Sequence, residues 1–128
     1  MANELILIVE DNDKNRKLAR DLLQFKGYRV AEAESAEAGL ALAAAQTPDL
    51  VLMDIHLPGM DGIEARGRLR ADPATSAVPV IAFTASVMPQ DRRQVTDAGF
   101  DGFVAKPISI KDFISTIEET LAARAKGV

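Results

Sequence analysis

The chain has 128 residues, of which 48 % are hydrophobic, and a formal net charge of −4. This length suits a single domain spanning residues 1–128 with a real core, and the lack of cysteine excludes disulfides and thiolate metal ligands. The acidic balance argues against binding to nucleic acid, which favours basic surfaces. The apolar run at residues 5–9 is too short for a signal peptide or a membrane span. We therefore expect a cytoplasmic protein with no membrane or nucleic-acid partner.

Segments typical of strands alternate along the chain with segments of helical spacing. Strands are predicted at residues 4–10, 28–34, 49–54, 78–85 and 100–106. Helices are predicted at residues 14–27, 36–46, 61–70 and 90–99, and from the cap Ser109 onward. The alternation implies an α/β fold with a parallel sheet and right-handed crossovers.

Three of the predicted helices differ in how much apolar surface they offer. The first carries Leu18, Leu22 and Phe25 at helical spacing. The last has one apolar stripe, formed by Ile110, Phe113, Ile114, Ile117 and Leu121. The helix at 90–99 has only Val95 and Ala98 as clear apolar contacts, so we expect it to shift at little cost in free energy.

Two predicted strands end in acidic residues. The commonest strand order for a small open sheet of this kind is 2-1-3-4-5, with a crevice beyond the carboxyl ends of strands one and three. Strand one ends in Glu10 and Asp11, and strand three ends in Asp54. Three carboxylates should thus meet at one edge of the sheet. The alternative is that Glu10 and Asp11 are ordinary loop residues that cap the first helix.

Converging carboxylates need a proton or a cation between them. Two unit charges about 4 Å apart repel by roughly 4 kcal/mol at an effective dielectric near 20, so three would not all stay ionised unaided. Hard oxygen ligands without cysteine favour Mg²⁺ over zinc. At the same edge, strand four ends in Thr84 and strand five in Lys106. A nucleophile, a metal, a hydroxyl donor and a fixed cation together describe a site for phosphoryl transfer.

Four motifs point to a known family. The stretches "LIVEDN", "DLVLMDIHLPGMDG", "VPVIAFTA" and "FVAKPI" resemble the receiver domain of two-component response regulators, the CheY-like superfamily. Through "VEDN", Asn15 and "DGFVAKPI", the chain is most similar to stand-alone receivers of the DivK type. The resemblance covers essentially the whole chain and implies a flavodoxin-like (βα)5 fold of three layers.

The resemblance also implies a role for each residue of the site. Asp54 would be the phosphoacceptor, and Asp11 and Asp54 would bind Mg²⁺ (or Mn²⁺) by their side chains. The other implied roles are a backbone-carbonyl metal ligand at His56, a water-mediated one at Glu10, phosphoryl contacts from Thr84 and Lys106, a switch formed by Thr84 and Phe103, and a cis peptide bond before Pro107.

The resemblance further implies a function and partners. A sensor histidine kinase or a histidine phosphotransfer protein would supply the phosphoryl group. The face formed by the helix at 90–99, the strand at 100–106 and the last helix would then bind an effector protein or kinase. The chain would catalyse its own phosphorylation and dephosphorylation rather than act as a turnover enzyme, and we expect no output domain. A receiver that binds proteins without phosphorylation remains an alternative.

Two rival classes fit less well, and two features stay open. A haloacid-dehalogenase-like phosphatase needs a second Asp two residues after Asp54, where His56 stands. A flavodoxin-like electron carrier needs a hydroxyl-rich phosphate-binding loop after strand one, but "EDNDKN" stands there and would repel phosphate. The side chain of His56 either influences dephosphorylation or is irrelevant beside its carbonyl. The basic cluster is either a solvated face or a docking surface, and it comprises Lys14, Arg16, Lys17 and Arg20.

Overall fold

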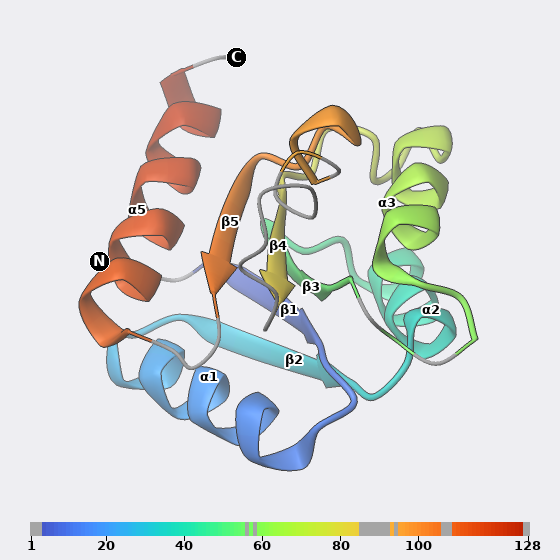
Figure 1. Cartoon of the computed structure of the whole chain (residues 1–128). Coiled ribbons are helices and arrows are strands. Elements are labelled where there is room, and N and C mark those ends of the chain that lie inside the picture. Colours follow the sequence, from blue (N-terminus) through green and yellow to red (C-terminus); the bar gives the residue numbers. More distant parts are fainter. Residues whose placement is uncertain are drawn as a thin grey trace.

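The fold is built on one parallel sheet of five strands in the order β2-β1-β3-β4-β5 (Figure 1). A computed structural model describes residues 4–55, 57, 59–84, 93, 95–105 and 109–126, without the side chains of Thr84 and residues 124–126. The strands are β1 Leu5–Val9, β2 Arg29–Ala33, β3 Leu50–Asp54, β4 Val80–Thr84 and β5 Gly102–Ala105. The order confirms the prediction from the sequence, and the strand ends lie within a few residues of the predicted ones.

Helices cover both faces of the sheet and complete a three-layer α/β fold (Figure 1). They are α1 Asp13–Phe25, α2 Ala36–Ala45, α3 Gly62–Ala71 and α5 Ile110–Lys126. One core cluster joins the sheet to α1 and α5, and a second joins it to α2 and α3. Of the predicted helix at 90–99, residues 93 and 95–97 are described and helical, and Gly99 ends it with a φ of 87°.

The two central strands, β1 and β3, are apolar because they are buried on both faces. All five residues of β1 and all five of β3 are buried, because helices cover both sides of a parallel sheet. Successive side chains alternate between the two faces. Leu50 and Leu52 therefore pack with α1 and α5, whereas Val51 and Met53 pack with α2 and α3. By the same alternation Asp54, at the end of β3, lies on the α1 and α5 face.

Side-chain caps set the starts of three helices. Asn12, Ser35 and Asp61 accept hydrogen bonds from the backbone N–H three residues later, at 3.0, 3.1 and 2.8 Å respectively. Such caps satisfy N–H groups that have no partner within the helix. The cap at Ser35 and the helix start at Asp61 and Gly62 confirm the sequence prediction.

The inward face of α1 differs from the predicted one. Ala19 and Leu23 are fully buried, whereas Leu18 and Phe25 are 43 % and 85 % exposed. The apolar residues of α1 fit more than one helical face, and the small Ala19 lets the helix approach the sheet closely, so the packed face is rotated away from Leu18. In α5 the predicted stripe is buried at its centre, but its first residue, Ile110, is 59 % exposed.

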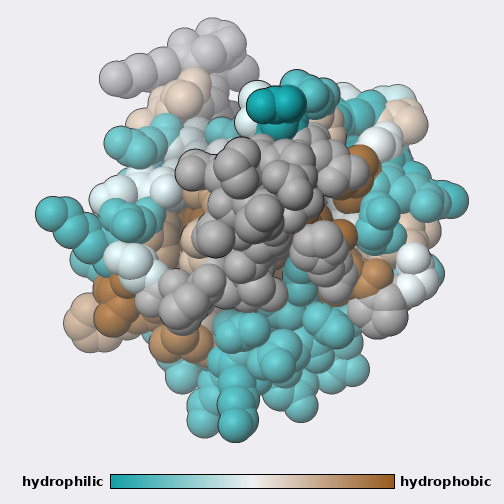
Figure 2. Space-filling model, in the orientation of Figure 1, coloured by the Kyte–Doolittle hydropathy of each residue, from teal (hydrophilic) through white to brown (hydrophobic). Residues whose placement is uncertain are grey.

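These exposed side chains leave an apolar patch on the surface. In Figure 2, brown and tan atoms gather at the lower left, over the first turn of α5 and the adjoining part of α1. The exposed large apolar residues of these two helices are Leu18, Phe25 and Ile110. In the part of the chain that the structure describes, no helix combines the length and apolar character needed to cross a bilayer.

Candidate functional site

Three carboxylates lie together where β1 and β3 end. The strands are neighbours, with Val9 beside Met53, so Glu10 and Asp54 follow at the same edge of the sheet. Carboxylate oxygens of Glu10, Asp11 and Asp54 all lie within 4.8 Å of one another. The structure therefore brings together the three acidic residues that the sequence places at strand ends.

The three carboxylates differ in exposure. Glu10 is fully buried, Asp54 is 4 % exposed, and Asp11 is exposed. The Glu10 Oε2 atom accepts a hydrogen bond of 3.0 Å from the Asn12 backbone N–H. Negative groups this close and this buried are costly without a compensating cation. A donor set made of carboxylate oxygens, open to solvent at Asp11, fits Mg²⁺.

A glycine at the start of α3 holds the end of β3 in place. A Cβ atom on Gly62 would lie 2.7 Å from the Ile55 Cα and closer still to the Asp54 carbonyl oxygen. The Gly62 N–H also donates to the Ile55 carbonyl oxygen, at 3.3 Å. The first turn of α3 is thus pressed against the backbone of Asp54, which fixes the position of that carboxylate.

Several predicted site residues can be placed only in part. Thr84 is the last residue of β4 and pairs with Ala105, the last residue of β5. Its backbone thus lies at the same edge as Asp54, which pairs with Phe83. The predictions for His56, Lys106 and Pro107, and for the Thr84 hydroxyl, fall outside the described residues and side chains and stay predictions.

Phe103 of β5 packs near the end of β3 and the helical turn at 95–97. It stands beside Ala82 in the sheet and packs, half-buried, on a small cluster formed by Ile55, Ala82 and Val95. Ile55 directly follows Asp54, and Val95 is the buried residue of the turn. Phe103 thus packs against the cluster that joins the acidic site to that turn.

One contact of the site is not apparent from the sequence. The basic cluster predicts a solvated or docking face for Arg16, yet its side chain is only 13 % exposed. Its Nη1 donates to the Glu10 carbonyl oxygen at 2.9 Å. Hydrogen bonding to Asp13 is the main cause that raises the pKa of Arg16 above its ordinary value, against a lowering by burial. The acidic pair Glu32 and Glu34, which share one face of the segment at β2, is a sequence feature that could have suggested carboxylate partners for an arginine of α1.

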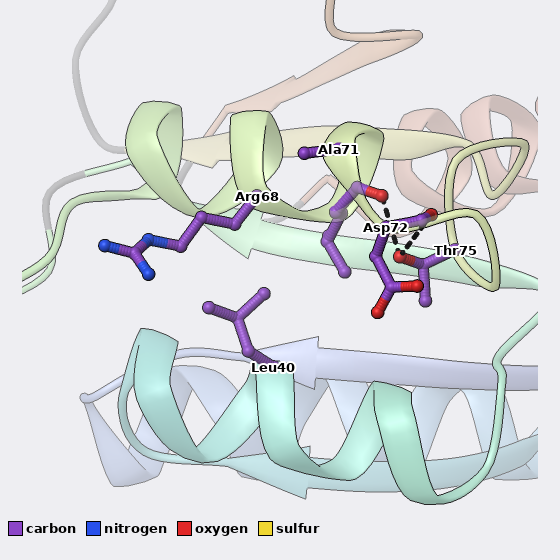
Figure 3. Close-up of a pocket in the computed structure, with 6 residues that line it drawn as sticks. Leu40, Arg68, Ala71, Asp72 and Thr75 are labelled. Carbon is purple, nitrogen blue, oxygen red and sulfur yellow. Dashed lines mark hydrogen bonds between the residues drawn. The ribbon is translucent and has the colours of Figure 1, made fainter.

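A hollow between α2 and α3 is separate from the three carboxylates of the acidic site (Figure 3). It has a volume of about 380 Å³ and is lined by Leu40, Arg68, Leu69, Ala71, Asp72 and Thr75. Most of these residues belong to the end of α3 opposite Gly62 or to the segment that follows it. The Thr75 hydroxyl donates to the Leu69 carbonyl oxygen at 2.7 Å, and Arg68 pairs with Glu64 at 3.1 Å. These polar groups are thus engaged in holding the fold.

Comparison with known proteins identifies the family. The sequence model of the response regulator receiver domain matches residues 6–118. The chain belongs to this family. Receiver domains act in two-component signalling, where they interact in general with histidine kinases and effectors, and they bind Mg²⁺ in an acidic pocket. The family resemblance, the fold and the receiver function expected from the sequence are confirmed.

Relatives and solved structures agree with this assignment. The polar-differentiation response regulator DivK of Brucella ovis is 41 % identical over 116 residues, which cover 91 % of this chain and 94 % of that protein. A response regulator structure from Chloroflexus aurantiacus has a TM-score of 0.89 at 29 % identity, covering 94 % of this receiver and 98 % of the other chain. The receiver domain of a Pseudomonas aeruginosa sensor histidine kinase has a TM-score of 0.86 at 32 % identity, covering 94 % and 99 % of the two chains. That structure holds a magnesium ion in its active-site cleft.

Proposed function

We propose that Asp54 is the phosphoacceptor of this receiver and takes a phosphoryl group from a phosphohistidine donor. The observation that carries the proposal is the approach of Asp54, Asp11 and Glu10 to within 4.8 Å at one sheet edge. Asp11 and Asp54 would hold Mg²⁺ directly, with the His56 carbonyl, and Glu10 would act through a bound water. The ion would supply positive charge that lets the carboxylate meet an anionic phosphoryl group.

The chain's own residues then position the transfer. An Asp54 carboxylate oxygen attacks phosphorus, an acyl-phosphate bond forms, and the bond from phosphorus to the donor imidazole nitrogen breaks. The buried strand and the close contact of Gly62 hold the nucleophile still, which supports positioning as a main contribution to the rate. The Thr84 hydroxyl and the Lys106 ammonium would contact the phosphoryl oxygens.

We infer that the signal leaves through Phe103. A phosphoryl group on Asp54 adds charge and acceptor oxygens near Thr84, and a Thr84 side chain drawn towards it would leave space that Phe103 can fill. The packing of Phe103 on Ile55 and Val95 supports this route. The helical turn at 95–97, β5 and α5 would then form the surface that an effector protein or kinase recognises.

The phosphodonor would be a sensor histidine kinase or a histidine phosphotransfer protein. The exposed apolar residues of α1 and α5 supply a docking surface for it, because exposed apolar patches mark interaction sites. Leu18 lies on the helix that starts beside the carboxylates, so a partner bound there could reach Asp54.

The test is phosphorylation by a small donor. Wild type incubated with acetyl phosphate and Mg²⁺ should gain the mass of one phosphoryl group as a hydroxylamine-labile acyl phosphate, and Asp54→Asn should gain none. Asp61→Asn is the matched control, because asparagine keeps the helix cap on the same loop. It should be labelled like wild type. A wild-type protein that gains no label contradicts the proposal and favours a receiver that binds proteins without phosphorylation. Normal labelling of Asp54→Asn also contradicts the proposal, because the phosphoryl group would then lie on another residue.

A further inference from the structure

Arg16 joins the loop between β1 and α1 to its surroundings. Its guanidinium lies 2.6 Å from the Asp13 carboxylate in the first turn of α1. It lies 3.4 Å from Glu32 of β2 and 3.4 Å from Glu34, just beyond β2. The fourth contact is the Nη1 bond of 2.9 Å to the Glu10 carbonyl oxygen. One side chain thus ties a loop carbonyl to three separate carboxylates.

The carbonyl contact is the one that concerns the acidic site. The carbonyl of Glu10 belongs to the peptide plane that joins Glu10 to Asp11, and that plane is rigid. A hydrogen bond to its oxygen therefore fixes the orientation in which the chain enters Asp11. On the other side of Asp11, Asn12 is held by its backbone bond to Glu10 Oε2 and by its capping bond to Asn15. Asp11 itself is exposed, so its carboxylate depends on this backbone for its position.

The geometry requires a guanidinium rather than a positive charge alone. Nη1 serves the carbonyl, Nη2 serves Asp13 and Glu34, and Nε faces Glu32. Arginine presents five N–H donors in a fixed planar fork, whereas lysine presents one compact ammonium group. A lysine at this position could pair with a carboxylate, but it could not hold the carbonyl and the carboxylates on both sides at once.

We propose that Arg16 is a positioning residue for the metal site, which holds Asp11 in place for Mg²⁺ through the Glu10 carbonyl. This inference rests on the proposed function, because it takes Asp11 as a metal ligand. Residues that orient metal ligands from behind commonly change metal affinity by about 10–100-fold when they are replaced. Since Arg16 holds backbone rather than a ligand atom, we expect the lower end of this range.

Positioning and simple electrostatics predict opposite signs. Replacing Arg16 with an uncharged residue removes a positive charge from the neighbourhood of the metal site. The replacement also leaves Asp13, Glu32 and Glu34 without that partner. By Coulomb attraction alone, Mg²⁺ should then bind more tightly. If Arg16 acts by holding the loop, Mg²⁺ should bind more weakly in spite of the added negative charge. The direction of the change therefore decides between the two effects.

The experiment is a Mg²⁺ titration by calorimetry, in the absence of phosphodonor. Arg16→Met should weaken binding by about tenfold, and Arg16→Lys should weaken it too, because the charge is kept but the fork is lost. Arg20→Met is the matched control, since Arg20 lies one turn further along α1 and its bonds go to Asp21 and Glu32. That variant loses the same charge and should bind Mg²⁺ as wild type does or slightly more tightly.

A second measurement separates positioning from loss of fold. Urea unfolding in EDTA should show that Arg16→Lys and Arg16→Met are folded under the titration conditions, and NMR amide shifts should change mainly around Asp11. If wild type binds Mg²⁺ and Arg16→Met binds it equally tightly or more tightly, the inference is overturned and the proposed function stands. A wild type that binds no Mg²⁺ overturns the metal site and the inference together. Equal weakening in Arg20→Met would show that the effect does not depend on the Arg16 bond to the Glu10 carbonyl, and this result also overturns the inference.

Discussion

Arg70 and Asp101 form an ion pair of 2.9 Å that ties the end of α3 to the entrance of β5. Arg70 also donates to the carbonyl oxygen of Ser76 at 2.8 Å, and the same Asp101 oxygen accepts from the buried Val80 N–H at 2.8 Å. One turn earlier on α3, the guanidinium of Arg66 lies 5.9 Å from the ring centre of Phe100. Two arginines of one helix thus contact residues 100 and 101, which lead directly into β5.

Replacing Asp101 should therefore destabilise the fold. Asp101→Ala leaves the N–H of Val80 buried without its acceptor, and we expect a loss of about 1–3 kcal/mol in the free energy of unfolding. Asp101→Asn keeps an acceptor and should lose less. Glu64→Ala, which breaks an exposed pair with Arg68, should cost less than about 1 kcal/mol. Urea denaturation of the three variants measures these differences, and equal losses for Asp101→Ala and Glu64→Ala would refute the explanation.

Two glycines of α3 should respond in opposite directions to alanine. Gly62→Ala places a methyl group against the backbone of Asp54 and Ile55, which cannot move aside as a flexible side chain can. We expect a destabilisation of about 1–3 kcal/mol together with weaker phosphorylation. Apart from its chain neighbours and the backbone of its own helix, no atom lies within 4 Å of a methyl group added at Gly67, so Gly67→Ala should stabilise the helix by up to about 1 kcal/mol. Thermal unfolding checks both signs.

Neutralising one carboxylate should stabilise the metal-free protein. Asp54→Asn removes one negative charge from a group of three, so the free energy of unfolding in EDTA should rise by about 1 kcal/mol. With saturating Mg²⁺, wild type should gain binding free energy that the variant gains only weakly, and the difference should shrink or reverse. Urea titrations with EDTA and with Mg²⁺ measure both. A variant less stable than wild type in EDTA would show that other contacts of Asp54 outweigh the repulsion among the carboxylates.

Tyr28 should make stability depend on pH in the alkaline range. Burial, with smaller effects of Glu118 and Glu4, raises the pKa of the Tyr28 phenol above its ordinary value near 10. The neutral form is favoured in the folded state, so this contribution is complete below about pH 10 and is lost as pH rises towards the folded pKa. Tyr28 is the only tyrosine and tryptophan is absent, so tyrosinate absorbance reports this group alone. Tyr28→Phe should lose this part of the pH dependence.

Much of the site follows from the sequence because strand ends are local signals. The apolar run of β3 stops at Asp54, the run of β1 stops before Glu10, and parallel strands bring their carboxyl ends to one edge. The caps at Ser35 and Asp61 were likewise predictable, since a cap and the N–H that it receives lie within one turn.

Only the tertiary structure decided which side chains of α1 face inward and what Arg16 does. Helical spacing allows Leu18 and Phe25 to face the core as readily as Leu23, and contact with the sheet selects the face with Ala19 and Leu23. Arg16 stands among basic residues in the sequence, and its partners include Glu32 and Glu34 on and beyond β2. A local pattern cannot report a contact that exists only once β1 and β2 lie side by side, because that pairing brings distant carboxylates to one guanidinium.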